Sequence, residues 1–475
     1  MEISMNKVVG SLKEAIRLSG LKDGMTVSFH HHLRNGDCVI NLVMDAIAEY
    51  GLKDITIAPS SIFPVHAPII EHMKSSVITH IDTDYISGPV GEAVSSGILE
   101  KPVMLRTHGG RPRAILEGSL HIDVAFIAAP TSDDMGNING VNGPSACGSL
   151  GYAMPDALKA DKVIAVTDTL VPYPNTPISI TQSNVDYVVE VSSIGESSGI
   201  VSGTTQITTD PVGNIIARKA ADVIEISGLM KEGMSFQTGA GGASLATAMY
   251  VKEKMINKKI SGSFGLGGIT EFFVNMLQIG LFKTLIDVQC FDIAAVKSLR
   301  ENPNHIEVSS SFYANPSAKS CTVDKLDVVV LGAMEIDTSF NVNVLTNSNG
   351  IIMGGSGGHS DAACGAKLTV IVANLLRSRL PTVVDSVITK VTPGHTVDVL
   401  VTEIGIAVNP KQAELKKRLF DAGLPAVEIE YLKEKAERIA GKAEKVTFTE
   451  DTVAIVEYRD GTIIDRVFKP FENGQ

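Results

Sequence analysis

Tryptophan is absent from this 475-residue chain, and aromatic residues make up only 5% of it. Cysteine is also scarce, and no Cys-x-x-Cys pair occurs. The five cysteines are Cys38, Cys147, Cys290, Cys321 and Cys364. Their scatter excludes a disulfide framework and a zinc site, and it is typical of proteins from a reducing compartment. Their apolar or Gly/Ala surroundings do not favour a low-pKa catalytic thiolate.

Positive charge is in deficit, because 41 Lys and Arg face 53 Asp and Glu, a net charge of -12. This balance argues against nucleic acid as the main partner, although a local basic pocket for an acidic substrate stays compatible with it. No apolar run reaches the roughly 18 residues that a membrane span needs. The first seven residues contain no apolar core of a signal peptide. We therefore expect a soluble, cytoplasmic protein.

Strands and helices alternate along the chain, which predicts an α/β fold. A strand over 25–29 is followed by a polar loop, a helix over 38–50 and a strand over 54–58. This order is typical of a parallel βαβ unit, whose functional loop lies at the carboxyl end of the strand. The length of the chain indicates two or three domains.

Two short sequences recur at nearly the same offset. Lys-Asp-Gly-Met at 22–25 is echoed by Lys-Glu-Gly-Met at 231–234, and the strand 120–127 is echoed by 325–331. A duplicated α/β domain explains both echoes; chance similarity of two Asp-headed strands is the alternative.

The duplication predicts one domain over 1–214 and another over 215–475. The polar segment 197–213, rich in Gly and Thr, is predicted to link them. Two strands over 451–458 and 462–468 flank an Asp-Gly turn and predict a C-terminal β-hairpin.

A glycine-rich stretch over 347–361 is the most distinctive part of the chain. It contains five glycines, ends in a histidine and an aspartate, and lies between a predicted strand over 327–332 and an apolar segment over 362–376. Glycines allow positive φ and close approach of the backbone to a ligand. Successive N–H groups could then converge on an anion or an oxyanion. A flexible turn without a ligand is the alternative.

A second glycine turn, 238–243, precedes a predicted helix over 243–255. The free N–H groups and the dipole of a helix N-terminus favour an anion. The turn is neither a Rossmann fingerprint, since Ser244 replaces the third glycine, nor a P-loop, since no Gly-Lys-Ser/Thr follows. An anion or oxyanion site and a turn that serves helix packing both remain open.

Basic side chains follow two of the predicted strands. His30, His31, His32 and Arg34 follow the first strand, without the carboxylate or cysteine spacing of a metal site. Donors for a carboxylate-rich substrate are one interpretation, and a solvated strand end is the other. The cluster over 106–113 is equally compatible with binding of phosphates or carboxylates and with surface decoration.

Segments 22–34, 58–61, 106–113, 239–242 and 341–361 resemble the citrate lyase alpha-subunit family, and the resemblance covers nearly the whole chain. It implies the CoA-transferase fold, with two related, mostly parallel α/β domains and an active site between them. The predicted C-terminal β-hairpin would be an appendage to these domains.

The resemblance also implies a reaction, in which an acetyl thioester and citrate give a citryl thioester and acetate. The thioester is carried by an acyl carrier (gamma) subunit on a group derived from dephospho-CoA, and a beta subunit then cleaves citryl thioester. Acetyl-CoA could replace the carrier as substrate, and no cofactor or metal would be bound permanently. A homo-oligomer within the complex is expected. The alternative is a non-catalytic, carrier-binding scaffold; sugar-phosphate isomerase chemistry fits less well.

One departure from the wider fold family bears on mechanism. Many CoA-transferases carry Ser-Glu-Asn-Gly, whose glutamate forms a thioester with CoA, and the matching residues at 347–350 are Asn-Ser-Asn-Gly. The missing carboxylate favours direct attack by citrate in a ternary complex. Positioning of the two reactants contributes up to ~7–11 kcal/mol, and each good oxyanion donor adds ~2.7–4 kcal/mol.

Site residues follow from the resemblance and from this chemistry. Catalytic candidates are Ser348, Asn349, Gly350, Gly357, Gly358 and His359; candidates for thioester or oxyanion contact are Gly239, Gly241, Gly242, Gly354 and Gly355; candidates for citrate binding are His30, His31, His32, Arg34 and Arg106. Asp361 is expected to shape the loop, and Glu403 is a weaker candidate. We expect 347–361 to lie where the two domains meet, with a path to solvent.

Overall fold

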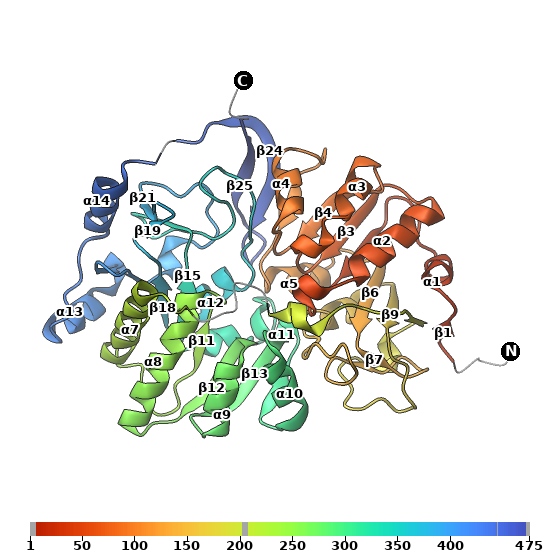
Figure 1. The fold of residues 1–475 in the computed structure, drawn as a ribbon, viewed down its shortest axis with the longest axis horizontal. Coiled ribbons are helices and arrows are strands. Elements are labelled where there is room, and N and C mark those ends of the chain that lie inside the picture. The colour runs from red at the N-terminus through yellow and green to blue at the C-terminus, as the bar shows by residue number, and fades with distance from the viewer. Residues whose placement is uncertain (1–5, 202–207, 444, 472–475) are drawn as a thin grey trace.

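Two sheets dominate the computed structural model, which describes residues 6–201, 208–443 and 445–471 (Figure 1). One sheet has ten strands and the other has eight. Apart from the last strand pair in each sheet, neighbouring strands run parallel. The predicted α/β fold is confirmed. The predicted link over 197–213 lies partly outside the described residues.

The first lobe is built on the ten-stranded sheet, in the order β1-β10-β9-β6-β2-β3-β4-β5-β24-β25. Its strands from the first half of the chain are β1 (Val8–Val9), β2 (Thr26–Phe29), β3 (Ile55–Pro59), β4 (Ile78–Thr83), β5 (Val103–Leu105), β6 (Val124–Ala129), β9 (Lys162–Thr167) and β10 (Tyr187–Glu190). Its helices are α1 (Leu12–Ser19), α2 (Val39–Tyr50), α3 (Ile69–Lys74), α4 (Pro89–Ser95), α5 (Gly110–Glu117) and α6 (Met154–Lys159). A small pair, β7 (Thr131–Ser132) and β8 (Ile138–Asn139), lies outside this sheet.

The second lobe is built on the eight-stranded sheet, in the order β14-β13-β12-β11-β15-β18-β22-β23. Its strands are β11 (Phe236–Thr238), β12 (Gly262–Ile269), β13 (Phe282–Cys290), β14 (His305–Glu307), β15 (Val328–Gly332), β18 (Leu368–Val372), β22 (Val399–Val401) and β23 (Ile406–Val408). Its helices are α7 (Pro211–Ile226), α8 (Gly242–Lys258), α9 (Glu271–Gln278), α10 (Ile293–Glu301), α11 (Ser310–Ala314), α12 (His359–Gly365), α13 (Ala413–Asp421) and α14 (Ile429–Ala440). Short strands β16 (Glu335–Asp337), β17 (Val342–Asn343), β19 (Leu376–Arg377), β20 (Leu380–Pro381) and β21 (Val383–Val384) lie beside this sheet.

The two lobes are structural repeats, as the paired echoes predict. The order β9-β6-β2-β3-β4-β5 in one sheet matches β18-β15-β11-β12-β13-β14 in the other. In each lobe the aspartate before the echoed strand accepts a hydrogen bond from the neighbouring strand segment. Asp123 accepts from the Thr26 amide (2.7 Å), and Asp327 accepts from the Ser235 amide (2.9 Å). The Asp-headed echo therefore marks one repeated contact.

Local signals explain where the first helices begin and end. Ser11 accepts a hydrogen bond from the Glu14 amide (3.2 Å) and caps α1, which ends at Gly20 in the left-handed region. Asp37 accepts from the Ile40 amide (3.2 Å) at the start of α2. Such caps satisfy N–H groups that the first turn of a helix leaves unpaired.

The predicted C-terminal hairpin is present as β24 (Phe448–Glu457) and β25 (Ile463–Pro470). It does not stay with the second lobe, because β24 pairs in parallel with β5 at the edge of the first sheet. In Figure 1 the hairpin stands at the top of the molecule, between the lobes. The chain thus returns to its first lobe, a connection that the proposed domain ranges do not include. None of the helices in the described part of the chain is long and apolar enough to cross a membrane.

A buried ion pair joins helices α5 and α6 of the first lobe. The guanidinium of Arg111 donates two hydrogen bonds to Asp156, of 2.8 and 2.7 Å, and one to the Ala58 carbonyl (2.7 Å). Both charged side chains are almost fully buried. Loss of one partner would leave the other charge buried and uncompensated.

We expect Arg111→Met to lower the free energy of unfolding by about 3–5 kcal/mol, because Asp156 would lose its partner. Urea denaturation followed by circular dichroism measures this change. The matched control is Arg300→Met, which removes an exposed pair with Glu301 and should change stability by no more than about 0.5 kcal/mol. An effect of Arg111→Met as small as that of the control would contradict the assignment.

Candidate functional site

The glycine-rich loop of the second lobe lies against the first lobe, as expected. The Gly354 carbonyl accepts a hydrogen bond from the Ile86 amide (3.1 Å), and the Gly357 carbonyl accepts from the His108 amide (2.8 Å). The Gly357 amide in turn donates to the Asp84 carbonyl (3.3 Å). Gly357 and Gly358 are half-buried, so this part of the loop stays in contact with solvent.

Close packing explains why several of these residues are glycine. A Cβ atom on Gly354 would lie 2.3 Å from the Val344 carbonyl oxygen, and one on Gly355 would lie 2.2 Å from the Asp84 carbonyl oxygen. On Gly358 it would lie 2.6 Å from the hydroxyl oxygen of Tyr313. The two backbones can approach this closely only without side chains between them. Packing alone accounts for Gly354 and Gly355, so their contact with a thioester remains a prediction.

The histidines after β2 reach the same junction. The ring of His31 lies 4.8 Å from that of Tyr152 and 5.7 Å from that of His108, measured between centroids. Its Nδ1 atom is 2.6 Å from Ser60 Oγ. The side chain of Gln289, on β13 of the second lobe, donates to the His31 carbonyl (3.0 Å). The structure therefore brings the predicted histidines together with the second lobe.

His30 and His32 are buried beside His31, with 5.7 Å between their ring centroids. Among the described residues, none is a hydrogen-bond partner for any of their four ring nitrogens. Burial lowers the pKa of both rings well below the usual value, and the charges of Arg111 near His30 and of His30 near His32 act in the same direction. Because buried polar atoms are usually hydrogen-bonded, these neutral imidazoles offer donors for a bound ligand.

Arg34 adds a positive charge to this group. Its guanidinium carbon lies 5.1 Å from the ring centroid of Phe63 and 4.9 Å from that of Phe291, which follows β13 in the second lobe. Burial lowers the pKa of Arg34 to about 10, so the group remains a cation at neutral pH. A cation held between two rings is fixed in place, as the recognition of a carboxylate requires.

A histidine–aspartate pair also lies here, and sequence reasoning did not select it. His108 Nδ1 is 2.9 Å from Asp84 Oδ2, and the other ring nitrogen lies 3.3 Å from the position of a Cβ on Gly357. Burial raises the pKa of the Asp84 carboxyl, and the bond to His108 opposes the rise. In the sequence, His108 is surrounded by arginines, and its partner Asp84 lies 24 residues away. No local pattern therefore indicates the pair.

The cluster over 106–113 is neither an open anion site nor surface decoration. Arg106 donates to Asp82 through Nε and Nη2 and to Glu457 through Nη1. Arg113 also donates to Glu457 (2.7 Å), and all of these groups are buried. Since protein carboxylates engage every guanidinium nitrogen of Arg106, its predicted contact with citrate does not fit the structure.

His359 and Asp361 both shape the loop. His359 Nδ1 is 2.7 Å from Thr392 Oγ1, and its Nε2 is 2.8 Å from the Gly332 carbonyl oxygen. Burial lowers the pKa of His359 to about 4, so the ring is neutral at pH 7. Both ring nitrogens are therefore engaged by other residues of the second lobe, and the catalytic role of His359 remains a prediction.

The tip of the loop contacts other elements. Ser348 Oγ accepts a hydrogen bond from Arg377 Nη2 (3.1 Å), while Asn349 is exposed. Gly350 has positive φ and faces the ring of Phe448, 2.5 Å from the position of a Cβ. Ser348 and Asn349 thus lie beside Arg377 and the C-terminal hairpin, and their roles in the reaction remain predictions.

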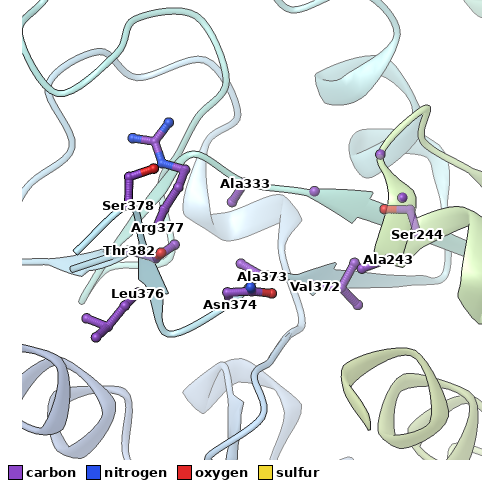
Figure 2. Close-up of a pocket in the computed structure, with 13 residues that line it drawn as sticks. Ala243, Ser244, Ala333, Val372, Ala373, Asn374, Leu376, Arg377, Ser378 and Thr382 are labelled. Atoms are coloured by element: carbon purple, nitrogen blue, oxygen red, sulfur yellow. The ribbon is translucent and has the colours of Figure 1, made fainter. Parts of the chain in front are cut away.

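Arg377 also lines a hollow of about 330 Å³ (Figure 2). The hollow lies at the carboxyl ends of β15 and β18 and at the N-terminus of α8. Strand order reverses at β11, between β12 and β15, and open α/β sheets bind ligands at such switch points. Ser244 stands at one side of the hollow, and Arg377 and Thr382 stand at the other (Figure 2).

The polar groups around this hollow suit an anion. The hydroxyls of Ser244 and Thr382 are buried, and no described residue is a hydrogen-bond partner for either. Gly241 and Gly242 line the hollow at the start of α8, where N–H groups lack partners within the helix. Gly239 differs, because its amide donates to the Val330 carbonyl (2.7 Å) and so is not available to a ligand.

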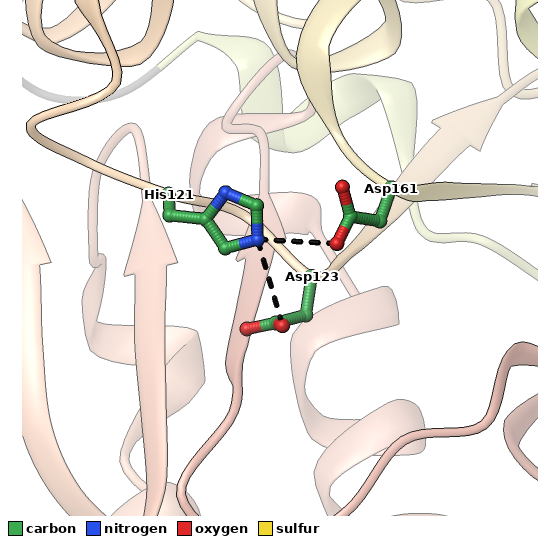
Figure 3. Close-up of side chains that lie close together, drawn as sticks. All are labelled: His121, Asp123 and Asp161. Carbon is green, nitrogen blue, oxygen red and sulfur yellow. Dashed lines mark hydrogen bonds and ion pairs between the residues drawn. The ribbon is translucent and has the colours of Figure 1, made fainter.

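Two other groups lie outside the candidate site. Glu403 accepts a hydrogen bond from the Leu375 amide (2.9 Å) and does not line the hollow. A second cluster lies at the amino ends of β6 and β9 in the first sheet and consists of His121, Asp123 and Asp161 (Figure 3). His121 Nε2 lies 3.1 Å from Asp161, within hydrogen-bond distance, and 3.7 Å from Asp123.

Comparisons with known proteins agree with this geometry. Residues 5–469 match the family described as citrate lyase, alpha subunit (CitF). The chain is 51% identical over 461 residues to the citrate lyase alpha chain of Escherichia coli (strain K12). The matched region covers 97% of this chain and 90% of that relative. It is 50% identical over 464 residues to the citrate lyase alpha chain of Klebsiella pneumoniae, with 98% and 91% covered.

Solved structures show the same relationship. A crystal structure described as the alpha subunit of citrate lyase from Streptococcus mutans, in complex with citrate, has a TM-score of 0.97 at 51% identity and covers 99% of this chain and 93% of its own. A 4-hydroxybutyrate CoA-transferase from Porphyromonas gingivalis, 17% identical, has a TM-score of 0.57 over 91% of this chain and 97% of its own, which shows a shared fold alone. The chain therefore belongs to the citrate lyase alpha-subunit family and has a fold of the CoA-transferase type.

Proposed function

We propose that this chain is the citrate CoA-transferase subunit of a citrate lyase. It would exchange acetyl for citryl on the thiol of an acyl carrier prosthetic group, with acetyl-CoA able to replace the carrier. The carrier (gamma) subunit would bring the thioester, and a separate lyase (beta) subunit would cleave the citryl product. The observation that carries the proposal is the set of buried ring nitrogens of His30 and His32, for which the described part of the chain offers no hydrogen-bond partner.

The histidine group is suited to citrate. Citrate has three carboxylates and a hydroxyl, so it needs several fixed hydrogen-bond donors within a small space. Neutral rings of His30 and His32 supply donors, and Arg34, whose charge acts on His31, supplies a cation. Hydrogen bonds to an ionised acceptor are about twice as strong as neutral ones. The related Streptococcus mutans structure is described in complex with citrate, which supports this substrate.

The hollow of the second lobe is suited to the thioester arm. The carrier's prosthetic group, like CoA, is phosphorylated, and phosphates bind at helix N-termini beside arginine. Arg377 and the start of α8 provide both features, and Ser348 is bonded to Arg377. The glycine-rich loop passes from this hollow to His108, so the two substrate regions adjoin opposite ends of one loop.

The proposed route needs no nucleophile from the protein. A citrate carboxylate oxygen attacks the thioester carbonyl and the C–S bond breaks. The thiolate is expelled, and a mixed anhydride of citrate and acetate is formed. The thiolate then attacks the citryl carbonyl of this anhydride, and acetate leaves. The resemblance to CoA-transferases implies that Ser348 replaces their glutamate nucleophile, so the protein's proposed contribution is to position the reactants and to stabilise the oxyanion.

The proposal is tested by mixing the full chain with acetyl-CoA and citrate, without added metal or nucleotide. We expect citryl-CoA and acetate to appear in equal amounts by mass spectrometry, and the same exchange on the acetylated carrier subunit. Binding of the carrier without any exchange, in the presence of both partner subunits, would favour the non-catalytic scaffold.

The same incubation separates the two chemical routes. In a ternary-complex mechanism, borohydride added after acetyl-CoA leaves activity unchanged, because no thioester forms on the protein. Loss of activity together with a glutamate reduced to its alcohol, located by peptide mass mapping, would show a covalent enzyme intermediate and overturn the proposed route.

His32→Phe tests the citrate region, because phenylalanine keeps the flat ring and removes both nitrogens. We expect the KM for citrate to rise at least about tenfold, since a hydrogen bond to a charged group contributes ~1.5–3 kcal/mol. The KM for acetyl-CoA should stay unchanged. The matched control is His121→Phe, at the opposite edge of the sheet, which should alter neither constant. An unchanged KM for citrate in a folded His32→Phe protein would remove the histidines from the site.

Arg377→Gln tests the thioester region. Loss of the cation should raise the KM for acetyl-CoA about tenfold and leave the KM for citrate unchanged, because a charge-assisted bond to phosphate contributes ~1.5–3 kcal/mol. Arg379→Gln is the control, since Arg379 is exposed two residues further on and does not line the hollow. Equal effects of the two substitutions, or a rise in the KM for citrate alone, would contradict this assignment.

A further inference from the structure

The C-terminal hairpin contacts both lobes. Strand β24 is hydrogen-bonded to β5 of the first lobe. At the other side, the ring of Phe448 covers Gly350, and Asp465 accepts a hydrogen bond from the Lys390 amide (2.5 Å) in the second lobe. The hairpin therefore joins the lobes along the side on which the glycine-rich loop begins.

Arg459 follows β24 and is almost completely buried at the junction. Its Nη2 donates to the Ala314 carbonyl (3.0 Å), and its Nη1 lies 3.6 Å from Asp324, both in the second lobe. Its Nε lies 3.6 Å from Asp361 Oδ1, and no hydrogen-bond partner for Nε occurs among the described residues. Its carbonyl accepts from Arg113 Nε in the first lobe (3.2 Å).

Asp361 ends the glycine-rich loop and ties it to the first lobe. Thr107 Oγ1 donates to Asp361 Oδ1 (2.9 Å), and the Gly109 amide donates to Oδ2 (2.9 Å). These two residues flank His108, whose own amide bonds to Gly357. The carboxylate of Asp361 thus fixes the segment that carries His108 to the loop that faces it.

We propose that Arg459 is a positioning residue for the exchange reaction. Its charge holds the Asp361 carboxylate, and that carboxylate holds His108 against the Gly357 peptide. The inference rests on the proposed function for its kinetic consequence, but the contact between hairpin and loop stands independently of it. Arg459 itself does not touch the proposed substrate regions, so its effect on the reaction is indirect.

The electrostatics around Asp361 give this proposal a pH signature. Burial raises the pKa of Asp361 to about 6, while the Arg459 guanidinium and the bonds from Gly109 and Thr107 oppose the rise. The other titratable groups that face Asp361 are His108, Tyr152, Tyr313 and Tyr458. Below about pH 6 the carboxyl is protonated and no longer attracts Arg459. Removal of the guanidinium raises the pKa further, so protonation then occurs at higher pH.

The experiment compares kcat/KM as a function of pH for the full chain and for Arg459→Gln, Arg459→Lys and Arg466→Gln. Arg459→Gln should shift the acidic limb of the kcat/KM profile to higher pH by about one unit. It should also lower kcat about 10- to 100-fold at pH 7, since misplaced reacting groups slow the reaction. Arg459→Lys, which keeps the charge, should restore most of both. Arg466, exposed on the same hairpin, is the control. Titration of citrate itself is common to all four proteins and cancels in the comparison.

Hydrogen–deuterium exchange of the same proteins gives a readout that does not depend on activity. In Arg459→Gln, peptides over 354–361 and 107–110 should exchange about tenfold faster at pH 7, while peptides of β11 and β15 stay protected. Unchanged exchange in these peptides, together with an unmoved acidic limb, would overturn the positioning role. If the unsubstituted chain catalyses no transfer but the loop loosens as described, the proposed function fails and the contact made by Arg459 stands.

Discussion

Contact of two backbones without intervening side chains is the constraint on which the rest of the structure depends. Glycines supply it from both lobes. A Cβ on Gly91 would lie 2.4 Å from the Ile352 carbonyl oxygen, and one on Gly151 would lie 2.3 Å from that of Val308. A Cβ on Gly109 would lie 2.1 Å from a carbonyl oxygen, and one on Gly355 would lie 2.2 Å from another. At these positions the close packing of the junction therefore depends on residues that have no side chain.

The buried basic side chains at this junction fall into two groups, charged arginines and neutral histidines. Arg106, Arg111 and Arg113 are each neutralised by protein carboxylates, which explains how a basic cluster can lie inside an acidic protein. The histidines beside them are kept neutral by desolvation and by neighbouring positive charges. A polyanion entering here would meet neutral donors close to one arginine and would not encounter a dense field of fixed charge.

The sequence predicted the repeated α/β fold because its signals are local and occur twice. The Asp-headed strands and the glycine turn before α8 lie within short windows, and each forms as expected. Contacts between distant segments left no such signal. The Asp84–His108 pair, the occupation of Arg106 by Glu457 and the return of β24 to β5 join residues separated by 24 to 351 positions. The sequence also does not reveal whether the ring nitrogens of a histidine such as His359 are free or hydrogen-bonded.

The return of the hairpin to the first sheet has a consequence for biosynthesis. Residues of β5 are made early, but their partner strand is made only after the entire second lobe. Until then β5 is an open edge, whose unpaired N–H and C=O groups can pair with another chain. The emerging chain is thus vulnerable to aggregation for as long as the second lobe is being translated, and a chaperone that covers this edge would act on an intermediate that the finished fold no longer displays.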